Sequence, residues 1–414
     1  MNHDTLDLIS KYQSSGKSFL YKMSGAISDE IRSDTNHFIT SDKRRYLNFG
    51  SYSIYLLGHN PKVIIESLIL QLEQLSGSSR TFPLRIQALA CKFLIENSPL
   101  HLQKVMMLNS GAEAIDAAIK LCRVSTEREE IFHAEGSYHG KTIGALSITD
   151  APIFKQPFGR LLSNVQKVSR VDSVAVSEKI RTEKPAAFFI EPIQGEGGIY
   201  EFESSYIQEI SKACNDVGTL LVFDEIQSGL GRTGTFWASE IFDVKPDIVI
   251  AGKALGAGII PVSALIATEK TFKPFDRDPI LHSSTFSGNP LASVAMLESL
   301  KLILDCNVPN LSKWKGEKLS AIINSIINDF PEIYEKRTGR GLLQGIHCQS
   351  AEISGLLVVY CLEEGLILTP CLSTPKVVRL SPSAFVSDEE LNMSSQILDV
   401  VSKKIIQEIK LRKC

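Results

Sequence analysis

Two side chains that could do chemistry follow two apolar stretches in the middle of the chain. Residues 220–223 form the first stretch, which ends at Asp224, and residues 248–250 form the second, which is soon followed by Lys253. Short apolar runs of this kind, ended abruptly by charged and glycine-rich segments, are typical of buried parallel strands. Because ligands bind at the carboxyl ends of strands in open α/β sheets, we expect the acid and the amine at neighbouring strand ends.

An acid and a lysine placed in this way suggest a specific covalent chemistry. A lysine amine can hold an aldehyde as a Schiff base. A buried carboxylate can keep the nitrogen of a pyridine ring protonated, which makes the ring an electron sink. These are the requirements of pyridoxal 5′-phosphate (PLP). The alternative is a strand-end salt bridge between Asp224 and a surface lysine, and the glycines around Lys253 (Gly252, Gly256 and Gly258) count against it.

Three longer segments make the pattern specific to one family. They are FDEIQSGLGRTG at residues 223–234, GKALGAG at 252–258 and HSSTFSGNPLA at 282–292. With them the chain, from about residue 47 to residue 379, resembles the class III (ω-type) PLP-dependent aminotransferases. That group includes ornithine, acetylornithine, 4-aminobutyrate and putrescine aminotransferases. The resemblance implies PLP as the cofactor, and an amine and a keto acid as the substrates.

A strand, a turn of small residues and a helix start follow one another near residue 110. Residues 105–108 predict the strand and residues 112–123 the helix. The free N–H groups and the dipole at the start of a helix favour an anion, although many such turns bind no ligand. The resemblance implies that Ser110, Gly111 and Ala112 hold the phosphate of PLP.

The resemblance also assigns roles around the cofactor ring. The residue that matches Tyr138 stacks on one face of the pyridine, as suits a flat, electron-poor ring. Ile226 packs on the opposite face, Gln227 bonds the ring 3-oxygen, and Asp224 bonds the ring nitrogen. Lys253 carries the cofactor and moves the proton of the reaction. The other cofactor-binding residues that the resemblance implies are His139, Glu191, Ser284 and Thr285.

Four residues match positions that line the substrate pocket in the family: Tyr52, Lys141, Glu196 and Arg379. The residue that matches Glu196 can pair with the distant arginine, and Tyr52 could equally be a packed tyrosine in a strand. Lys141 stands where relatives acting on ornithine-type α-amino acids have arginine, and it is similar to the lysine of putrescine-type enzymes. We therefore expect a primary amine or ω-amine as the donor and 2-oxoglutarate as the acceptor.

The strands and helices expected around these residues indicate an α/β protein. The resemblance implies the PLP-dependent transferase fold type I, with a large domain around a mainly parallel seven-stranded sheet and a smaller α+β domain. We expect residues 59–305 to form the large PLP-binding domain and residues 306–414 the C-terminal small domain, to which residues 1–58 contribute. The family residue that matches Thr285 reaches the cofactor phosphate of the partner subunit, which implies a homodimer with shared active sites.

Composition excludes several other classes of protein. The chain is 43% apolar and 22% charged, and its net charge of −3 predicts neither nucleic acid nor an anionic membrane as a partner. No apolar run approaches the roughly 18 residues that span a bilayer. No signal peptide is visible at the N-terminus. The eight cysteines are scattered without a CxxC pair, which argues against a zinc site and against a disulfide framework, and for reduced thiols in the cytoplasm.

Several alternatives within the same fold stay open on residue types alone. The donor could be an ornithine-type or acetylornithine-type α-amino acid, or the enzyme could aminate an aldehyde of a larger biosynthetic intermediate. An aminomutase or a decarboxylase would use the same residues. A PLP-binding transcription regulator is disfavoured because no basic helix-turn-helix extension is present, and a degenerate paralogue is disfavoured because both Lys253 and Asp224 are retained.

Overall fold

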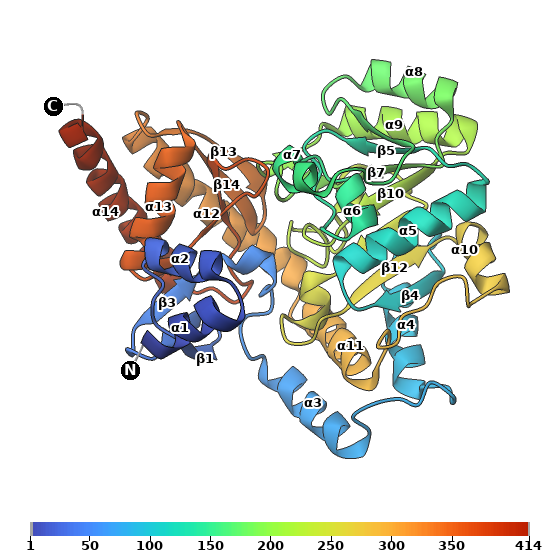
Figure 1. Cartoon of the computed structure of the whole chain (residues 1–414), viewed down its shortest axis with the longest axis horizontal. Helices are drawn as coiled ribbons and strands as arrows, with labels where there is room; N and C mark the ends of the chain where they lie inside the picture. The colour runs from blue at the N-terminus through green and yellow to red at the C-terminus, as the bar shows by residue number, and fades with distance from the viewer. Residues whose placement is uncertain (1–2, 413–414) are drawn as a thin grey trace.

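A seven-stranded sheet lies at the centre of the larger part of the molecule (Figure 1). The structure, a computed structural model, describes residues 3–412. In spatial order the strands are β4 (Lys104–Leu108), β12 (Ser263–Ala267), β11 (Ile248–Ala251), β10 (Leu220–Asp224), β7 (Ala187–Ile190), β5 (Ile131–Ala134) and β6 (Val165–Val168). Neighbouring strands run parallel except β12, which is antiparallel to both β11 and β4. The predicted mainly parallel sheet is therefore confirmed.

Helices cover both faces of this sheet, which explains why its strands are apolar throughout rather than alternating with polar residues. Phe188 and Phe223 pack on one face, and Phe189 and Val222 pack on the other. The first face is covered by α4 (Arg85–Glu96), α8 (Ser173–Glu183), α9 (Ser204–Val217) and α11 (Pro290–Asp305), and the second by α5 (Gly111–Thr126) and α10 (Glu269–Arg277). The sheet is thus buried as the middle layer of an α/β/α sandwich, and the carboxyl ends of its parallel strands remain at one edge.

The smaller part of the molecule combines the two ends of the chain (Figure 1). One sheet contains β1 (Glu30–Asp34), β2 (His37–Thr40), β3 (Arg45–Asn48) and the short β15 (Leu366–Ile367). A second contains β13 (Tyr334–Arg340), β14 (Leu343–Cys348), β17 (Val377–Leu380) and β16 (Thr369–Pro370). Leu47 and Phe49 share one hydrophobic cluster with residues of α12 (Val308–Asp329), α13 (Ala351–Glu363) and α14 (Asp388–Arg412).

We propose the domain limits predicted from the sequence: a large domain of residues 59–305, and a small domain of residues 306–414 with residues 1–58. The hydrophobic clusters support this division, because Leu47 and Phe49 belong to a cluster whose other buried members lie within residues 319–405. Helix α12 connects the two parts, since Val308 near its start packs in the large cluster and Leu319 in the small one.

The remaining elements are short or peripheral. They are α1 (His3–Tyr12), α2 (Ser15–Ser24), η1 (Ser51–Ser53), α3 (Lys62–Gln74), α6 (Ile143–Ser147), α7 (Pro152–Lys155), η2 (Gln156–Phe158), β8 (Ile193–Gln194), β9 (Tyr200–Glu201), η3 (Ala238–Ile241) and η4 (Lys253–Gly256). Helix α3 lies at the edge of the molecule (Figure 1), where Ile64 and Leu68 pack into the hydrophobic cluster of the large part. Within residues 3–412, no helix is both long and apolar enough to span a membrane.

Candidate active site

A cavity of about 230 Å³, here called the strand-end pocket, lies at the carboxyl ends of β10 and β11. Asp224 ends β10 and Lys253 begins the turn after β11, so the parallel pairing of these strands brings the acid and the amine to one pocket. Its lining residues are Gly111, Ala112, Tyr138, His139, Gly140, Glu191, Glu196, Asp224, Ile226, Gln227 and Lys253. All of them except Gly140 were predicted from the sequence as site residues.

Lys253 occupies an unusual backbone position. Its φ of 45° lies in the left-handed region, which residues other than glycine rarely adopt and which is often found at functional sites. Burial lowers the pKa of Lys253, although the Glu196 carboxylate opposes this shift. A lowered pKa increases the fraction of neutral amine near pH 7, and the neutral amine is the form that can attack a carbonyl carbon or accept a proton.

Both oxygens of Asp224 are held by hydrogen bonds. Oδ2 accepts a bond of 2.7 Å from Nδ1 of His139, and Oδ1 accepts one of 3.0 Å from the Ile226 amide. Because the Asp224 carboxylate is the acceptor, Nδ1 of His139 carries the hydrogen. The Asp224 side chain is only 4% exposed. The carboxylate is therefore fixed in orientation in a low-dielectric environment, where its charge acts strongly on a neighbouring group.

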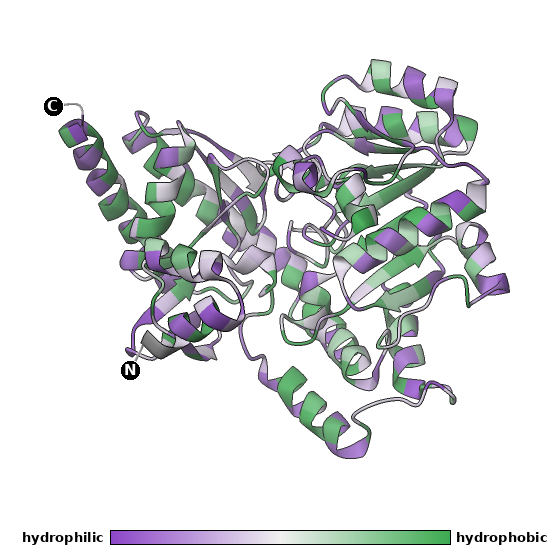
Figure 2. Ribbon diagram, viewed as in Figure 1, coloured by the Kyte–Doolittle hydropathy of each residue, from purple (hydrophilic) through white to green (hydrophobic). Residues whose placement is uncertain are grey.

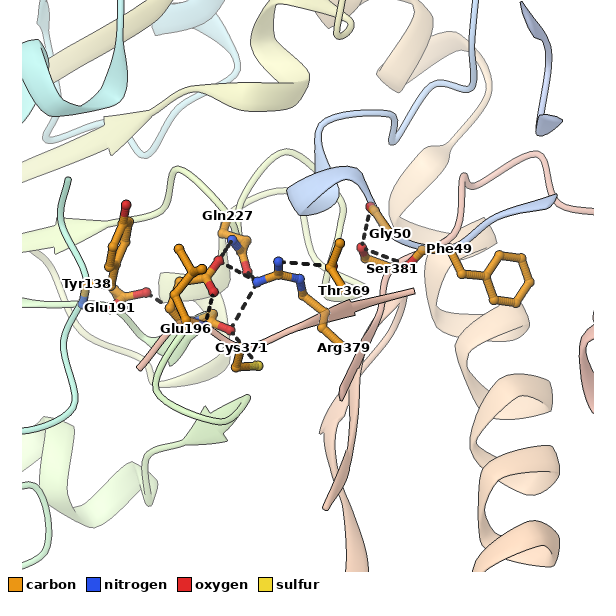
Figure 3. Close-up of polar contacts among 12 residues, drawn as sticks. Phe49, Gly50, Tyr138, Glu191, Glu196, Gln227, Thr369, Cys371, Arg379 and Ser381 are labelled. Atoms are coloured by element: carbon orange, nitrogen blue, oxygen red, sulfur yellow. Dashed lines mark hydrogen bonds and ion pairs between the residues drawn. The ribbon is translucent and has the colours of Figure 1, made fainter. Parts of the chain in front are cut away.

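Glu191 connects the aromatic wall of the pocket to the loop that carries Glu196. One of its oxygens accepts a hydrogen bond of 2.8 Å from the Tyr138 amide, and the other accepts one of 3.0 Å from the Gly195 amide (Figure 3). Burial raises the pKa of Glu191 to about 7. Through these two hydrogen bonds, Glu191 holds the Tyr138 backbone and the loop at Gly195 in place.

The start of helix α5 offers a place for an anion. The Ser110 hydroxyl caps the helix by accepting a bond from the Glu113 amide, and Gly111 and Ala112 of the first turn line the strand-end pocket. First-turn amides have no acceptor within their own helix. A Cβ on Gly111 would lie 2.6 Å from Cδ1 of Ile226, so only glycine allows the helix start to approach that side chain closely.

Arg379 and Glu196 form a buried ion pair at the pocket, with 2.5 Å between Nη1 and Oε1 (Figure 3). The second Glu196 oxygen accepts a bond of 2.9 Å from the Leu372 amide, and Nη1 of Arg379 also donates to Oε1 of Gln227 at 3.2 Å. Burial alone would raise the pKa of Glu196, but the Arg379 charge and the Leu372 amide outweigh it and lower the pKa. Glu196 and Arg379 are thus both charged and bound directly to each other, an arrangement here called the closed pair.

These residues fit PLP by their chemical types. The helix start, built from small residues, suits a phosphate, Tyr138 offers an aromatic face, and the oriented Asp224 suits a protonated ring nitrogen. Lys253, with its lowered pKa, suits the attachment of an aldehyde. The close contact that Gly111 makes possible is the observation that tests the fit, because a larger side chain would fill the space next to Ile226.

Six predicted residues do not line the strand-end pocket of their own chain: Ser110, Ser284, Thr285, Tyr52, Lys141 and Arg379, the last of which reaches the lining through its ion pair with Glu196. Ser110 caps α5 directly behind the pocket. Ser284 accepts a hydrogen bond of 2.7 Å from Asn109. Thr285 is exposed and lines a separate groove of about 710 Å³.

Tyr52 and Lys141 are two predicted substrate-pocket residues that lie outside the lining of the strand-end pocket. Tyr52 is in the turn η1 rather than in a strand, is about half exposed, and its ring centroid lies 5.5 Å from the Arg379 guanidinium. Lys141 is exposed, and its Nζ lies 4.0 Å from the centroid of the Phe154 ring. The structure thus brings Tyr52 to Arg379 and directs Lys141 to Phe154.

Sequence reasoning missed several residues that hold the ion pair. Thr369 accepts a bond of 3.3 Å from Nη2 of Arg379, and Leu372 holds Glu196. No local pattern identifies them, because the pairing of β16 with β17 sets Thr369 opposite Arg379, and Leu372 lies in the segment between these two strands. Gly195 had a signal in its glycine-rich segment: a Cβ there would lie 2.0 Å from Oε1 of Gln227.

Comparisons with known proteins agree with this site. The family model for aminotransferase class-III matches residues 27–401. A putrescine aminotransferase from Pectobacterium atrosepticum is 34% identical over 384 residues, which cover 90% of this chain and 81% of that protein. The structure of an ornithine aminotransferase from Toxoplasma gondii has a TM-score of 0.87 at 26% identity, with coverage of 95% of this chain and 96% of that one.

A third relative shows the fold alone. The ω-transaminase from Pseudomonas jessenii, solved in complex with PMP, has a TM-score of 0.87 at 22% identity and covers 95% of this chain and 96% of that one. The fold type I architecture predicted from the sequence is therefore confirmed. Together with the family match over most of its length, this shows that the chain belongs to the class III aminotransferases, PLP-dependent enzymes that transfer an amino group between an amine and a keto acid.

Proposed function

We propose that this aminotransferase takes its amino group from a primary amine or ω-amine without a nearby α-carboxylate, and passes it to 2-oxoglutarate. The closed Glu196–Arg379 pair is the observation that carries the proposal. While Glu196 neutralises Arg379, the pocket presents no free guanidinium to the carboxylate of an α-amino acid. A diamine would meet a neutral wall, whereas a keto acid could displace Glu196 and bind the Arg379 fork through two parallel hydrogen bonds.

The position of Lys141 supports the same substrate class. A lysine offers a carboxylate a point charge rather than a planar fork, so it holds an α-amino acid less well than arginine would. Its Nζ also lies against the Phe154 ring and outside the lining of the strand-end pocket. The 34% identical putrescine aminotransferase agrees with a diamine donor. The structural similarity to an ornithine aminotransferase makes ornithine the second candidate.

In this proposal each residue has one task during turnover. When bound, PLP supplies an aldehyde that links to amines and a ring that accepts electrons. Lys253 holds the cofactor at rest, and its Nζ then moves the proton at the amine-bearing carbon of the substrate. Asp224, oriented by His139 and the Ile226 amide, holds the proton on the ring nitrogen. Tyr138 covers the ring and excludes water from one side.

Substrate preference is the direct test of this proposal. We expect kcat/KM with 2-oxoglutarate to be higher for putrescine than for ornithine or 4-aminobutyrate in a steady-state panel, with pyruvate as the alternative acceptor. We also expect Lys141→Arg to shift the preference towards ornithine, because the fork can bind an α-carboxylate through two bonds. Lys179→Arg is the matched control, because Lys179 also lies over an aromatic ring, that of Phe132. This variant should leave the preference between putrescine and ornithine unchanged.

A wild-type preference for ornithine of tenfold, or about 1.4 kcal/mol, would contradict the diamine proposal and favour the ornithine-type enzyme. An aldehyde of a larger intermediate would instead appear as weak activity with all three small amines. The cytoplasmic location expected from the scattered thiols stays a prediction.

We further propose a homodimer with composite active sites. Helix α3 is largely apolar (Figure 2), and its side chains Val63, Leu70 and Leu72 are each at least half exposed. Phe82 and Phe286, at 77% and 72% exposure, border the groove that Thr285 lines. Exposed apolar surface of this extent is typical of protein–protein interfaces. A second copy of the chain would cover it and bring Thr285 to the partner's cofactor phosphate.

Complementation between variants tests the composite site. Lys253→Ala chains mixed with Thr285→Ala chains should form heterodimers in which one site combines an intact Lys253 with an intact Thr285. The mixture should therefore be more active than Thr285→Ala alone. A Lys253→Ala/Thr285→Ala double variant mixed with Thr285→Ala is the control, since no intact site can form. Monomeric sedimentation at assay concentrations, or equal activity in both mixtures, would contradict the proposal.

A further inference from the structure

Arg232 is a buried guanidinium in the loop that follows Asp224, outside the strand-end pocket. It is only 1% exposed, and within residues 3–412 it forms no ion pair with a carboxylate. Its donors instead reach three backbone carbonyls. Nη1 donates to Leu342 at 3.1 Å and also to Pro382, and Nη2 donates to Ser53 at 3.1 Å. One side chain of the large domain thus contacts three separate segments.

The three carbonyls belong to the segments that surround the Arg379 end of the site. Ser53 ends the turn η1, which carries Tyr52. Pro382 follows strand β17, which carries Arg379. Leu342 lies between β13 and β14, and its amide in turn donates to the Arg232 carbonyl at 2.9 Å. Arg232 therefore binds both substrate-side segments to the loop that starts at Asp224.

The turn η1 needs such an anchor. Ser51, Tyr52 and Ser53 all have φ between 52° and 66°, a conformation that is costly for residues with a side chain. The Ser381 amide holds one end of the turn by donating to the Phe49 carbonyl at 2.7 Å, and Arg232 holds the other end through Ser53. Backbone strain of this kind persists only where surrounding contacts enforce it.

Burying the Arg232 guanidinium to bind three carbonyls costs free energy. A buried charge without a counter-charge loses its hydration, and burial, together with the nearby positive charge of Arg379, lowers the pKa of Arg232 to about 9. The planar fork of arginine does, however, hold acceptors in fixed relative directions, which lysine cannot do.

We infer that Arg232 is a positioning residue for substrate recognition: it sets Tyr52 and Arg379 relative to Asp224 and so determines how well the keto acid carboxylate is gripped. The inference rests on the proposed function, in which Arg379 binds that carboxylate. Arg232 does not itself reach the pocket. A small displacement of the two segments weakens a bidentate contact, because that contact depends on distance and direction.

Arg232→Lys tests this, since it keeps the charge and loses the fork. We expect KM for 2-oxoglutarate to rise about tenfold or more while kcat falls less than about threefold, a split that indicates lost binding rather than lost chemistry. Arg232→Met, which keeps the volume and removes the charge, should show the same split. Hydrogen exchange of the chain without cofactor should also speed up in peptides covering residues 47–57 and 377–384.

Gln344→Ala is the matched control. Gln344 is also a buried polar side chain, and it donates to the Gly316 and Gly341 carbonyls within the small domain. Within residues 3–412 it forms no hydrogen bond with Ser53 or Pro382. Even if Gln344→Ala loses as much thermal stability as the Arg232 variants, it should leave KM for 2-oxoglutarate unchanged. An equal KM rise in Gln344→Ala, an unchanged KM in both Arg232 variants, or failure of both Arg232 variants to fold would overturn the inference in favour of a purely structural role.

Failure of the proposed function would look different. A wild-type protein that does not use 2-oxoglutarate would refute that proposal, and KM for the keto acid could then not be measured. The exchange measurement needs neither substrate nor cofactor. Faster exchange of residues 47–57 and 377–384 in Arg232→Lys, but not in Gln344→Ala, would still support the placement of these segments by Arg232, and unchanged exchange would overturn it.

Discussion

Lys253→Ala should abolish turnover and remove the visible absorbance of the cofactor-loaded enzyme. Lys253 is the lysine that lines the strand-end pocket, it follows β11 directly, and burial lowers its pKa. Its amine is expected to act both as the covalent attachment and as the group that moves the proton. Because one side chain serves both tasks, alanine removes them together, and we expect the activity to fall by about six orders of magnitude, the scale on which catalytic nucleophiles act.

Borohydride reduction followed by peptide mapping identifies the attached lysine. In the wild type the label should lie on the peptide that contains Lys253, and in Lys253→Ala no lysine should be labelled. Lys141→Ala is the control, because Lys141 is near in sequence to Tyr138 but its amine contacts Phe154. That variant should keep both the label and the absorbance. A label on another lysine in the wild type would refute the mechanism.

The second large effect is expected at Asp224. Asp224→Asn should lower kcat by about 10²–10³, or several kcal/mol, as is found when other preorganised electrostatic groups are removed. The neutral amide cannot hold a proton on the ring nitrogen, so the ring accepts electrons less well. Thermal stability should change little, because the side chain is replaced by one of nearly the same shape at the end of β10.

Glu225→Gln is the comparison that separates catalysis from folding. Glu225 follows Asp224 and is equally buried, but its oxygens accept hydrogen bonds from the Ala238 and Ser239 amides, away from the pocket. We expect this variant to lose thermal stability while it retains kcat. Measuring kcat and the unfolding temperature of both variants therefore tests the assignment, and an Asp224→Asn enzyme with near-normal kcat would contradict it.

The contrast between these two neighbouring acids shows what sequence can tell about a site. Asp224 and Glu225 are both carboxylates at the end of an apolar strand, and side chains alternate in direction along a strand. The pattern predicts that one of them faces the ligand edge, and the family motif indicates which one. The partners that fix each carboxylate are distant in sequence: His139 for Asp224, and Ala238 and Ser239 for Glu225.

The sequence alone was enough to predict the central sheet and the pocket residues that follow its strands β10 and β11. Buried strands read as continuous apolar runs, and their ends are marked by the charged and glycine residues that follow them. The fold type, the cofactor and the family follow from motifs whose residues are close together in the chain. Asp224 and Lys253 were predicted from the ends of such apolar runs, and Ile226 and Gln227 from the family resemblance. All four line one pocket in the structure.

The tertiary structure decided how the substrate side is built. The three strands within residues 30–48 are short, and the pairing of β3 with β15 depends on residues at the other end of the chain. The direction of the Lys141 side chain towards Phe154 depends on helix α7. The anchoring of Tyr52 and Arg379 by Arg232 likewise joins segments that no local pattern connects, because hydrogen bonds between distant carbonyls and a buried fork exist only once the domains have packed.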